Sequence, residues 1–259
     1  MCRWLNIPRS SYYYQAVDPV SEADLEDKIT YIFLESKSIY GARKIKKCLE
    51  KDGIILSRRR IRRIMKRLNL VSVYQKAAFK PHSRGKNEAP IPNRLDRQFD
   101  QERPLEALVT DLTYVRVDRR WAYVCLTIDL SNREIIGLTV GWHNTAELVK
   151  QAIQSIPYAL TKAKLFHSDR GKEFDNQLID EMLEAFGITR SLSQAGCPYD
   201  NAVAESTYRS FKLEFINQET FQSLKELALK TKDYVHWWNY HRIHGSLNYQ
   251  TPMTKRIIA

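Results

Sequence analysis

Two acidic residues are expected to lie on strands, one inside a strand and one at a strand tip. Asp111 lies inside LEALVTDLTYVRV, whose β-branched residues and partial alternation indicate a strand buried on both faces. Asp169 follows the short apolar pair Leu165-Phe166 and precedes Arg170-Gly171, which is typical of a strand tip where the chain turns. A carboxylate inside a buried strand is costly unless it has a positive partner. We therefore expect Asp111 to meet a cation.

A third acid, Glu205, falls on an expected helix. That helix is predicted to begin near Asp200-Asn201, where either side chain could serve as N-cap, and to run from Ala202 to about Ile216. Hard divalent cations such as Mg²⁺ take oxygen ligands, and two of them about 3.5–4 Å apart can activate an attacking oxygen and stabilise a leaving one. Three acids sharing such cations would act on a phosphodiester.

The spacing of the acids makes this hypothesis specific. Since 205 − 169 = 36, 35 residues separate Asp169 from Glu205. This pattern, with DLTYV around Asp111, HSDRG around Asp169 and GCPYDNAVAES ending one residue after Glu205, resembles the OrfB-type transposases of bacterial insertion sequences, in the insertion sequence three family. Those enzymes have the DDE integrase core of retroviral integrases.

The resemblance implies a function and a set of partners. Asp111, Asp169 and Glu205 would be catalytic and would hold Mg²⁺, with Mn²⁺ as a substitute. The reaction would be 3′-end cleavage and strand transfer on double-stranded DNA, by an oligomer that is at least a dimer. In this family an upstream OrfA-type product often joins the chain by frameshifting, so it is a possible fusion or partner. The alternatives are an inactive regulator that binds transposon ends and a ribonuclease H-type nuclease, which the basic N-terminal region disfavours.

Residues near the three acids have candidate roles. Arg209 and Lys212 follow Glu205 by four and seven residues, on the same helical face, and the family has a basic residue at the seventh position. Lys212 is thus expected to contact DNA, against the alternative of a helix ion pair. His167 and Asn201 are candidates for a supporting layer around the metals, although a histidine at a position like that of His167 is more often a packed strand residue.

Other acids fit structural roles better. Asp129 ends an expected strand before a turn, Glu173 and Asp175 are placed at the start of an expected helix, and Asp200 is a good N-cap.

Charge is distributed unevenly along the 259 residues. Residues 1–105 hold 23 Lys and Arg against 12 Asp and Glu, which accounts for the whole net charge of +11. A basic first third joined to a neutral remainder indicates a nucleic-acid-binding module attached to another domain.

The basic region, residues 1–71, is predicted to hold three helices. They cover residues 22–34, a segment beginning near 42, and a segment after Ser57, which is a plausible N-cap. The arrangement predicts a helix-turn-helix unit, and its sequence is similar to the one ahead of the core in the same family. Its third helix carries a basic face of predicted DNA-binding residues: Arg58, Arg59, Arg62, Arg63, Lys66 and Arg67.

Residues 72–104 are predicted to be a linker, because prolines and charges interrupt any periodicity. Its basic residues could contact phosphate, or the segment could be a solvated tether; they are Lys76, Lys80, Arg84 and Lys86.

Residues 105–220 alternate as an α/β domain. Three strands at 106–117, 121–130 and 134–142 are joined by short turns, and strands and helices then alternate up to the helix of Glu205. This order predicts a ribonuclease H-like core after an all-α helix-turn-helix domain. Residues 221–259 are expected to form a closing helical segment, in which Trp237 and Trp238 belong to the core more simply than to a base-stacking site.

Composition excludes several other classes. The chain has no apolar run near the ~20 residues of a membrane span and no signal peptide, and its four cysteines form no Cys-x-x-Cys pair. We expect a cytoplasmic, nucleoid-associated protein with reduced cysteines and no membrane partner.

Overall fold

The computed structural model describes residues 21–75 and 91–258, together with Trp4 and Pro8. The chain divides into two compact units, Met1–Ser72 and Val73–Ala259, which we treat separately. Four basic residues of the expected linker lie outside the described residues: Lys76, Lys80, Arg84 and Lys86.

The described residues of the first unit form three helices, as the sequence predicts. They are α2 (Glu22–Glu35), α3 (Ala42–Lys51) and α4 (Arg58–Arg67). Ser21 and Ser57 cap α2 and α4, since their side chains accept hydrogen bonds from the N–H groups of Asp24 and Arg60. The helices bury one apolar stripe each, and the innermost side chains are Leu25, Ile29, Ile45, Leu49, Ile61 and Ile64.

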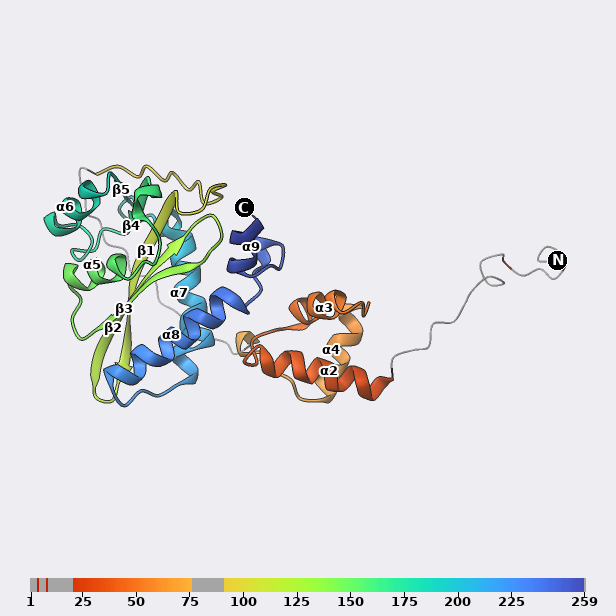
Figure 1. Ribbon diagram of the computed structural model, residues 1–259. Helices are drawn as coiled ribbons and strands as arrows, with labels where there is room; N and C mark the ends of the chain where they lie inside the picture. The colour runs from red at the N-terminus through yellow and green to blue at the C-terminus, as the bar shows by residue number, and fades with distance from the viewer. Residues whose placement is uncertain (1–3, 5–7, 9–20, 76–90, 259) are drawn as a thin grey trace. The chain divides into compact units, whose positions relative to one another are not determined.

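The second unit is built on a five-stranded sheet of order β3-β2-β1-β4-β5 (Figure 1). Its strands are β1 (Ala107–Val117), β2 (Arg120–Asp129), β3 (Ile135–Gly141), β4 (Leu165–Ser168) and β5 (Thr189–Leu192). The first three are antiparallel, whereas β4 runs parallel to β1 and β5 parallel to β4. This topology confirms the predicted ribonuclease H-like core.

Helices cover both faces of the sheet. One face packs against α5 (Ala146–Gln154) and α6 (Gln177–Ala185), and Figure 1 shows α7 (Ala202–Glu214) and α8 (Leu224–Tyr240) on the other side. Gly137 allows α5 to approach closely, because a Cβ there would lie 2.6 Å from the carbonyl oxygen of Ala152. The sheet is therefore buried between two helical layers.

Aromatic side chains fill the space between α7 and α8. Tyr234 stacks on Phe215 and meets Phe211 edge-on, with ring centroids 5.2 and 5.4 Å apart. Trp237 and Trp238 are buried, and the indole N–H of Trp238 donates to a backbone carbonyl of the β2–β3 turn. Both tryptophans thus lie in the core. The chain then ends in α9 (Pro252–Ile258).

The described parts of the expected linker make contacts within the second unit. The single turn Val73–Gln75 places the Tyr74 hydroxyl against Ser210 and Glu214 of α7. Residues 91–104 also lie on the core, where Leu95 is buried. These contacts are sequence-distant, so local periodicity could not predict them.

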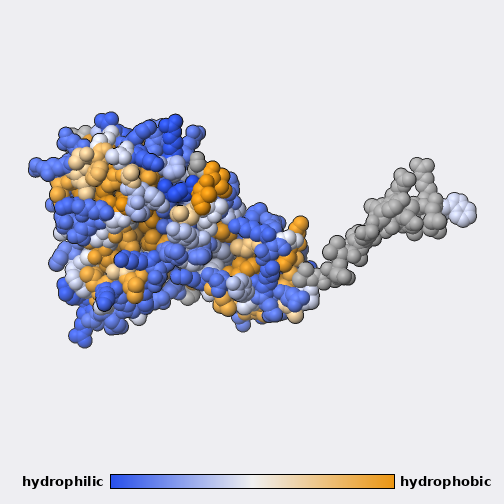
Figure 2. Space-filling model, viewed as in Figure 1, coloured by the Kyte–Doolittle hydropathy of each residue, from blue (hydrophilic) through white to orange (hydrophobic). Residues whose placement is uncertain are grey.

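The surface of the second unit is mostly hydrophilic in the view of Figure 2, with a hydrophobic area over α5 and the adjoining strands. A smaller hydrophobic area lies at α9, whose Ile257 and Ile258 are exposed. Among the described residues, no helix has the length and apolar character that a membrane crossing needs.

Candidate active site

Strand register brings Asp111 and Asp169 side by side. β1 and β4 pair in parallel up to Val109 opposite His167, so continuing each chain by two residues sets Asp111 opposite Asp169. Two residues along a strand return to the same face, and neighbouring strands lie about 4.8 Å apart. The two acids therefore project on the same side of the sheet, at the point where β4 ends.

Helix α7 is tied to β1 at the level of Asp111. The Tyr208 hydroxyl donates to the carbonyl oxygen of Asp111 and accepts from the N–H of Leu126 at 2.6 Å. Asn201 Nδ2 donates to the carbonyl oxygen of Thr110 at 3.4 Å. Glu205 lies between these two anchors along the chain, so both fix its position along β1 at the level of Asp111. Nothing in the sequence pointed to Tyr208, because its partners are backbone atoms about 80 to 100 positions away.

The start of α7 differs from the expectation in its chemistry. The helix begins at Ala202, close to the predicted position, but the side chain of its N-cap residue Asn201 makes no capping hydrogen bond. Asp200 is not a cap either, since its carboxylate binds Gln194 and Arg97. The capping prediction was wrong because tertiary partners took both polar side chains.

Electrostatics link the acids into one group. Burial and the negative charges of Asp169, Glu205 and Glu173 together raise the pKa of Asp111 to about 7, against a hydrogen bond from the N–H of Leu112 that lowers it. The pKa of Asp169 is also raised, by burial and by Glu173, against a 3.0 Å hydrogen bond from the N–H of Gly171. We name Asp111, Asp169, Glu173 and Glu205 the acid cluster.

Glu173 is the residue of the acid cluster that the sequence did not predict to lie there. It was expected to open a helix, but α6 begins at Gln177, capped by the Asn176 side chain. Glu173 lies in the preceding turn, with its carboxylate 2.6–2.8 Å from where a Cβ on Gly171 would be. The Glu173 carboxylate therefore lies directly over Gly171 of the HSDRG motif, which places a fourth carboxylate beside Asp169.

The donor set fits a divalent cation that arrives with its substrate. In the described ranges, no Lys or Arg forms an ion pair with Asp111 or Asp169. Within the same residues, no three His, Cys, Asp or Glu side chains already form a closed metal site. Mg²⁺ is commonly held by one or two carboxylates, with waters and substrate phosphates completing its shell. Asp111 and Asp169, which repel each other and have no such ion pair among the described residues, suit that mode of binding.

His167 and Asn201 differ in how they relate to the acids. His167 is fully buried, and both ring nitrogens contact serines, Nδ1 at 2.8 Å from Ser191 Oγ and Nε2 at 3.1 Å from Ser193 Oγ. Burial lowers its pKa to about 4, so it is neutral. No hydrogen bond joins it to Asp169. Asn201 is 4% exposed and anchors α7, while its Oδ1 has no hydrogen-bond partner in the described part of the chain.

The two basic residues of α7, Arg209 and Lys212, lie in different surroundings. Arg209 is exposed one turn beyond Glu205. Lys212 is half-buried, with Nζ 4.7 Å from the centre of the exposed Tyr114 ring. A cation–π contact of this kind holds the ammonium group near β1. The predicted role of both residues in DNA contact stays a prediction.

The basic face of α4 is exposed in the first unit. All six predicted residues are exposed, and Arg67 pairs with Glu22 (3.0 Å) and Glu26 of α2. Ion pairs among the described residues do not include the other five, which are Arg58, Arg59, Arg62, Arg63 and Lys66. Arg67 thus helps to join two helices, and the five remaining cations form the accessible face.

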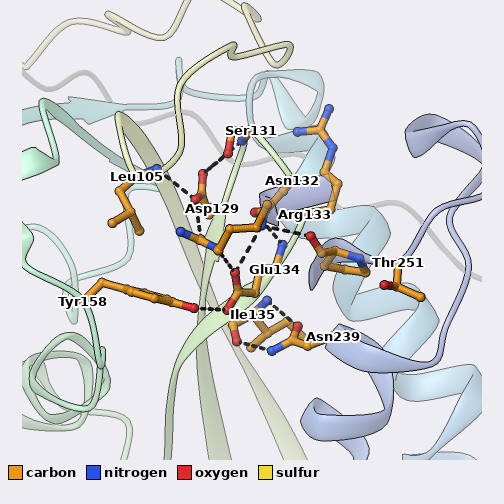
Figure 3. Close-up of polar contacts among 12 residues, drawn as sticks. Leu105, Asp129, Ser131, Asn132, Arg133, Glu134, Ile135, Tyr158, Asn239 and Thr251 are labelled. Carbon is orange, nitrogen blue, oxygen red and sulfur yellow. Dashed lines mark hydrogen bonds and ion pairs between the residues drawn. The ribbon is translucent and has the colours of Figure 1, made fainter. Parts of the chain in front are cut away.

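A second set of acids in the same sheet has partners. Arg256 Nη2 lies 2.8 Å from Asp129 Oδ2, and its Nε contacts Glu134. The Tyr158 hydroxyl donates to Glu134 at 2.8 Å, and the N–H groups of Leu105 and Ser131 donate to Asp129 (Figure 3). We name Asp129, Glu134, Tyr158 and Arg256 the paired-acid cluster. Asp129 therefore has a structural role, as the sequence favoured.

These features define a ribonuclease H-like domain with an acid cluster at the end of its central parallel strands, in a chain that also has a basic helical unit. Comparison with known proteins agrees. Residues 101–198 and 186–252 each match a model described as an integrase core domain, and residues 20–78 match an HTH-like domain.

Curated relatives cover nearly the whole chain. The transposase for insertion sequence element IS904 of Lactococcus lactis subsp. lactis (strain IL1403) is 28% identical over 88% of this chain and 91% of its own length. The transposase for insertion sequence element IS629 of Shigella sonnei is 28% identical over 97% of this chain and 88% of its own. The chain belongs to the insertion-sequence transposases that combine an integrase core domain with an HTH-like domain.

A solved structure shows the same fold. A simian T-cell lymphotropic virus intasome, determined by cryo-EM in complex with PP2A regulatory subunit B56 gamma, aligns with a TM-score of 0.51 at 11% identity. The alignment covers 82% of this chain and 70% of that one. The likeness confirms the fold class that the strand order predicts.

Proposed function

We propose that this chain carries out DNA transposition by metal-dependent 3′-end cleavage and strand transfer, with Asp111, Asp169 and Glu205 as its catalytic residues. The main support is that Asp111, set opposite Asp169 by strand register, has its pKa raised to about 7 by burial and by neighbouring carboxylates. A protein that buries like charges without a cation of its own leaves them for an external one. Family membership supports the same reaction class.

The three carboxylates would hold Mg²⁺, or Mn²⁺ in its place. When bound, the cation would activate the attacking oxygen and stabilise the leaving oxygen of a phosphodiester. The chain's own residues supply position. Tyr208 and Asn201 fix α7 against β1, so that Glu205 stays at the height of Asp111. Such positioning is a large part of catalysis in phosphoryl transfer.

Double-stranded DNA would be held in two places. The exposed cations of α4 are suited to transposon ends, because Arg and Lys neutralise phosphates and Arg can also contact guanine in the major groove. Arg209 and Lys212 would contact DNA near the cut, since they follow Glu205 on the same helix. Joining two ends requires at least a dimer, and an upstream OrfA-type product is a candidate partner. The predicted boundaries of the DNA-binding region, linker, core and closing segment also stay part of this proposal.

The test is a cleavage and strand-transfer assay on labelled transposon-end DNA with Mg²⁺ or Mn²⁺, with the upstream partner supplied. We expect Asp169→Asn and Glu205→Gln to lower product formation by more than about 10³-fold, because each removes a charge that the transition state needs. DNA binding should remain within about twofold. Glu184→Gln, which neutralises an exposed acid on α6, is the matched control and should behave as wild type.

Two results would contradict the proposal. Unchanged activity in Asp169→Asn and Glu205→Gln would remove these acids from catalysis. A wild type that binds ends but forms no product with either cation would favour a regulator that only occupies the transposon ends.

A further inference from the structure

Residues 91–97, which we name the strap, lie along β5 and the residues that follow it. The N–H of Leu192 donates to the carbonyl oxygen of Pro92 at 3.5 Å. Ser191 Oγ accepts from the N–H groups of Arg94 and Leu95 at 2.9 and 3.2 Å. Leu95 is only 2% exposed, so an apolar anchor reinforces the polar contacts. The strap is a built part of the core although the sequence marks it as linker.

The strap also meets the motif around Asp169. Arg170 donates from Nη2 to the carbonyl oxygen of Ile91 at 3.2 Å, and from Nε to that of Ser193 at 2.6 Å. One side chain thus joins the strap to the chain leaving β5. Arg170, which directly follows the proposed catalytic residue Asp169, therefore holds the strap in place.

The strap ends at an ion pair with the segment before α7. Arg97 Nε donates to Asp200 Oδ1 at 2.8 Å, and Asp200 Oδ2 accepts from the N–H of Gln194 at 2.9 Å. Residues 193–201, which we name the active-site loop, join β5 to α7. Gln194 and Asp200 stand near its two ends, so the Asp200 carboxylate closes the loop on itself and Arg97 holds it closed.

The carboxylate of Asp200 needs this partner. The residue is 1% exposed, and an ionised carboxylate at that depth is costly without opposite charge and hydrogen bonds. Burial raises its pKa, but the N–H of Gln194 and the Arg97 guanidinium lower it by more, so it is ionised. Asn201 and Glu205 follow directly, so any movement of the loop is passed to them.

We propose that Arg97 is a positioning residue: by pairing with Asp200 it closes the active-site loop and so fixes Asn201 and Glu205 against β1. The inference rests on the proposed function for its catalytic consequence only. Asn201 would lose its 3.4 Å contact with Thr110 if the loop opened, which would remove one of the two hydrogen-bonded anchors described above and leave that of Tyr208. A displacement of about 1 Å at a catalytic group can cost about 100-fold in rate.

A direct role in DNA binding makes a different prediction. The Arg97 side chain is 55% exposed and could reach a phosphate. Loss of a phosphate contact weakens binding and reduces its salt dependence. Loss of a positioning contact lowers kcat and leaves KM for DNA nearly unchanged.

The experiment compares Arg97→Ala and Arg97→Lys with Arg94→Ala in the full chain. Arg94 is the matched control, because it is an exposed arginine three residues earlier on the strap whose side chain forms no ion pair with the described residues. Amide hydrogen exchange of residues 193–201 is measured without DNA or metal, and kcat and KM for strand transfer are measured separately.

We expect Arg97→Ala to speed exchange in the active-site loop about 10-fold and to lower kcat about 10- to 100-fold, with KM within about twofold. Arg97→Lys keeps the charge and should restore kcat to within about threefold, while Arg94→Ala should match wild type in both measurements. If Arg97→Ala does not fold, Arg97→Gln replaces it, since Gln keeps one N–H donor but no charge; faster exchange and lower kcat are again expected.

Unchanged exchange in the active-site loop would overturn the inference. So would a normal kcat with raised KM and a weaker salt dependence, which would make Arg97 a phosphate contact. Because exchange is read without substrate, an inactive wild type would count against the proposed function while the exchange result still decides on Arg97.

Discussion

The two groups of acids on the sheet differ in their partners. In the paired-acid cluster, Asp129 and Glu134 share the guanidinium of Arg256, and backbone and side-chain donors fill their remaining positions (Figure 3). In the acid cluster, Asp111 receives one backbone hydrogen bond and the repulsion of three carboxylates. The same residue types therefore hold α9 in place at one site, and at the other we propose that they bind a cation.

The contrast shows how a structural acid can be told from a functional one. A buried acid that serves stability is paired, because an unpaired charge would cost more than it returns. A buried acid left among like charges lowers stability, which a protein tolerates where a ligand later relieves the strain. Partner type and exposure both separate Asp129, which is fully buried and paired with Arg256, from the partly exposed Asp111.

Removing the cation from the paired-acid cluster should give the largest effect on stability. Arg256→Ala leaves Asp129 and Glu134 buried and unpaired, and we expect the free energy of unfolding to fall by about 3–5 kcal/mol in urea titrations. Lys255→Ala, at the neighbouring position of α9, is the control and should change it by less than about 0.5 kcal/mol. A loss below about 1 kcal/mol for Arg256→Ala would mean that this cluster contributes little to the fold.

The acid cluster should respond in the opposite direction. The pKa of Asp111 in the folded chain, about 7, exceeds its unfolded value near 3.9. Its contribution to stability is therefore fully present below pH 4 and is lost as pH rises through 7. Asp111→Asn removes this loss, and we expect a melting temperature about 2–4 °C above wild type at pH 8 without metal.

The effect of Mg²⁺ on the melting temperature is the complementary measurement. It should raise the melting temperature of the wild type more at pH 8 than at pH 5.5, since protons compete for Asp111 at the lower pH. Asp111→Asn should lose most of this gain. An equal gain at both pH values, or in both proteins, would indicate that Mg²⁺ binds elsewhere.

Local patterns carried most of the fold. Apolar periodicity predicted α2 and α4, with Ser57 as a cap, and alternation with short turns predicted the meander of β1, β2 and β3. These features depend on residues within one or two turns of each other, so a sequence displays them directly. The parallel register that sets Asp111 opposite Asp169 came from the structure, because it pairs strands that lie far apart in the sequence.

Contacts between segments far apart in the sequence could not be predicted from such local patterns. The strap, with its Arg97–Asp200 pair, looked like linker because prolines and charges hide its single anchor, Leu95. Glu173 was predicted to begin a helix because acids favour that position, but α6 begins at Gln177 and the Glu173 carboxylate lies over Gly171 instead. Both depend on side chains meeting across folded elements, which composition does not encode.

Glu173 allows the smallest and sharpest test of the comparison. Its charge raises the pKa of both Asp111 and Asp169, so Glu173→Gln should lower both values. The acidic limb of the strand-transfer pH profile should then move to lower pH, by a few tenths of a unit to about one unit. Activity at the optimum should stay within about fivefold, because the three proposed catalytic acids remain.

Asp175→Asn is the matched control for Glu173→Gln. Asp175 is exposed two residues later and pairs with Arg190 at 2.8 Å, so its loss should leave the pH profile unchanged. An equal shift of the pH profile in both variants would mean that Glu173 acts only as a general surface charge and not through its position beside Asp111 and Asp169. If Glu173→Gln lost as much strand-transfer activity as Asp169→Asn, Glu173 would instead be a direct ligand of the cation. The acid cluster would then bind its cation through four carboxylates, whereas in the paired-acid cluster one arginine pairs with two carboxylates.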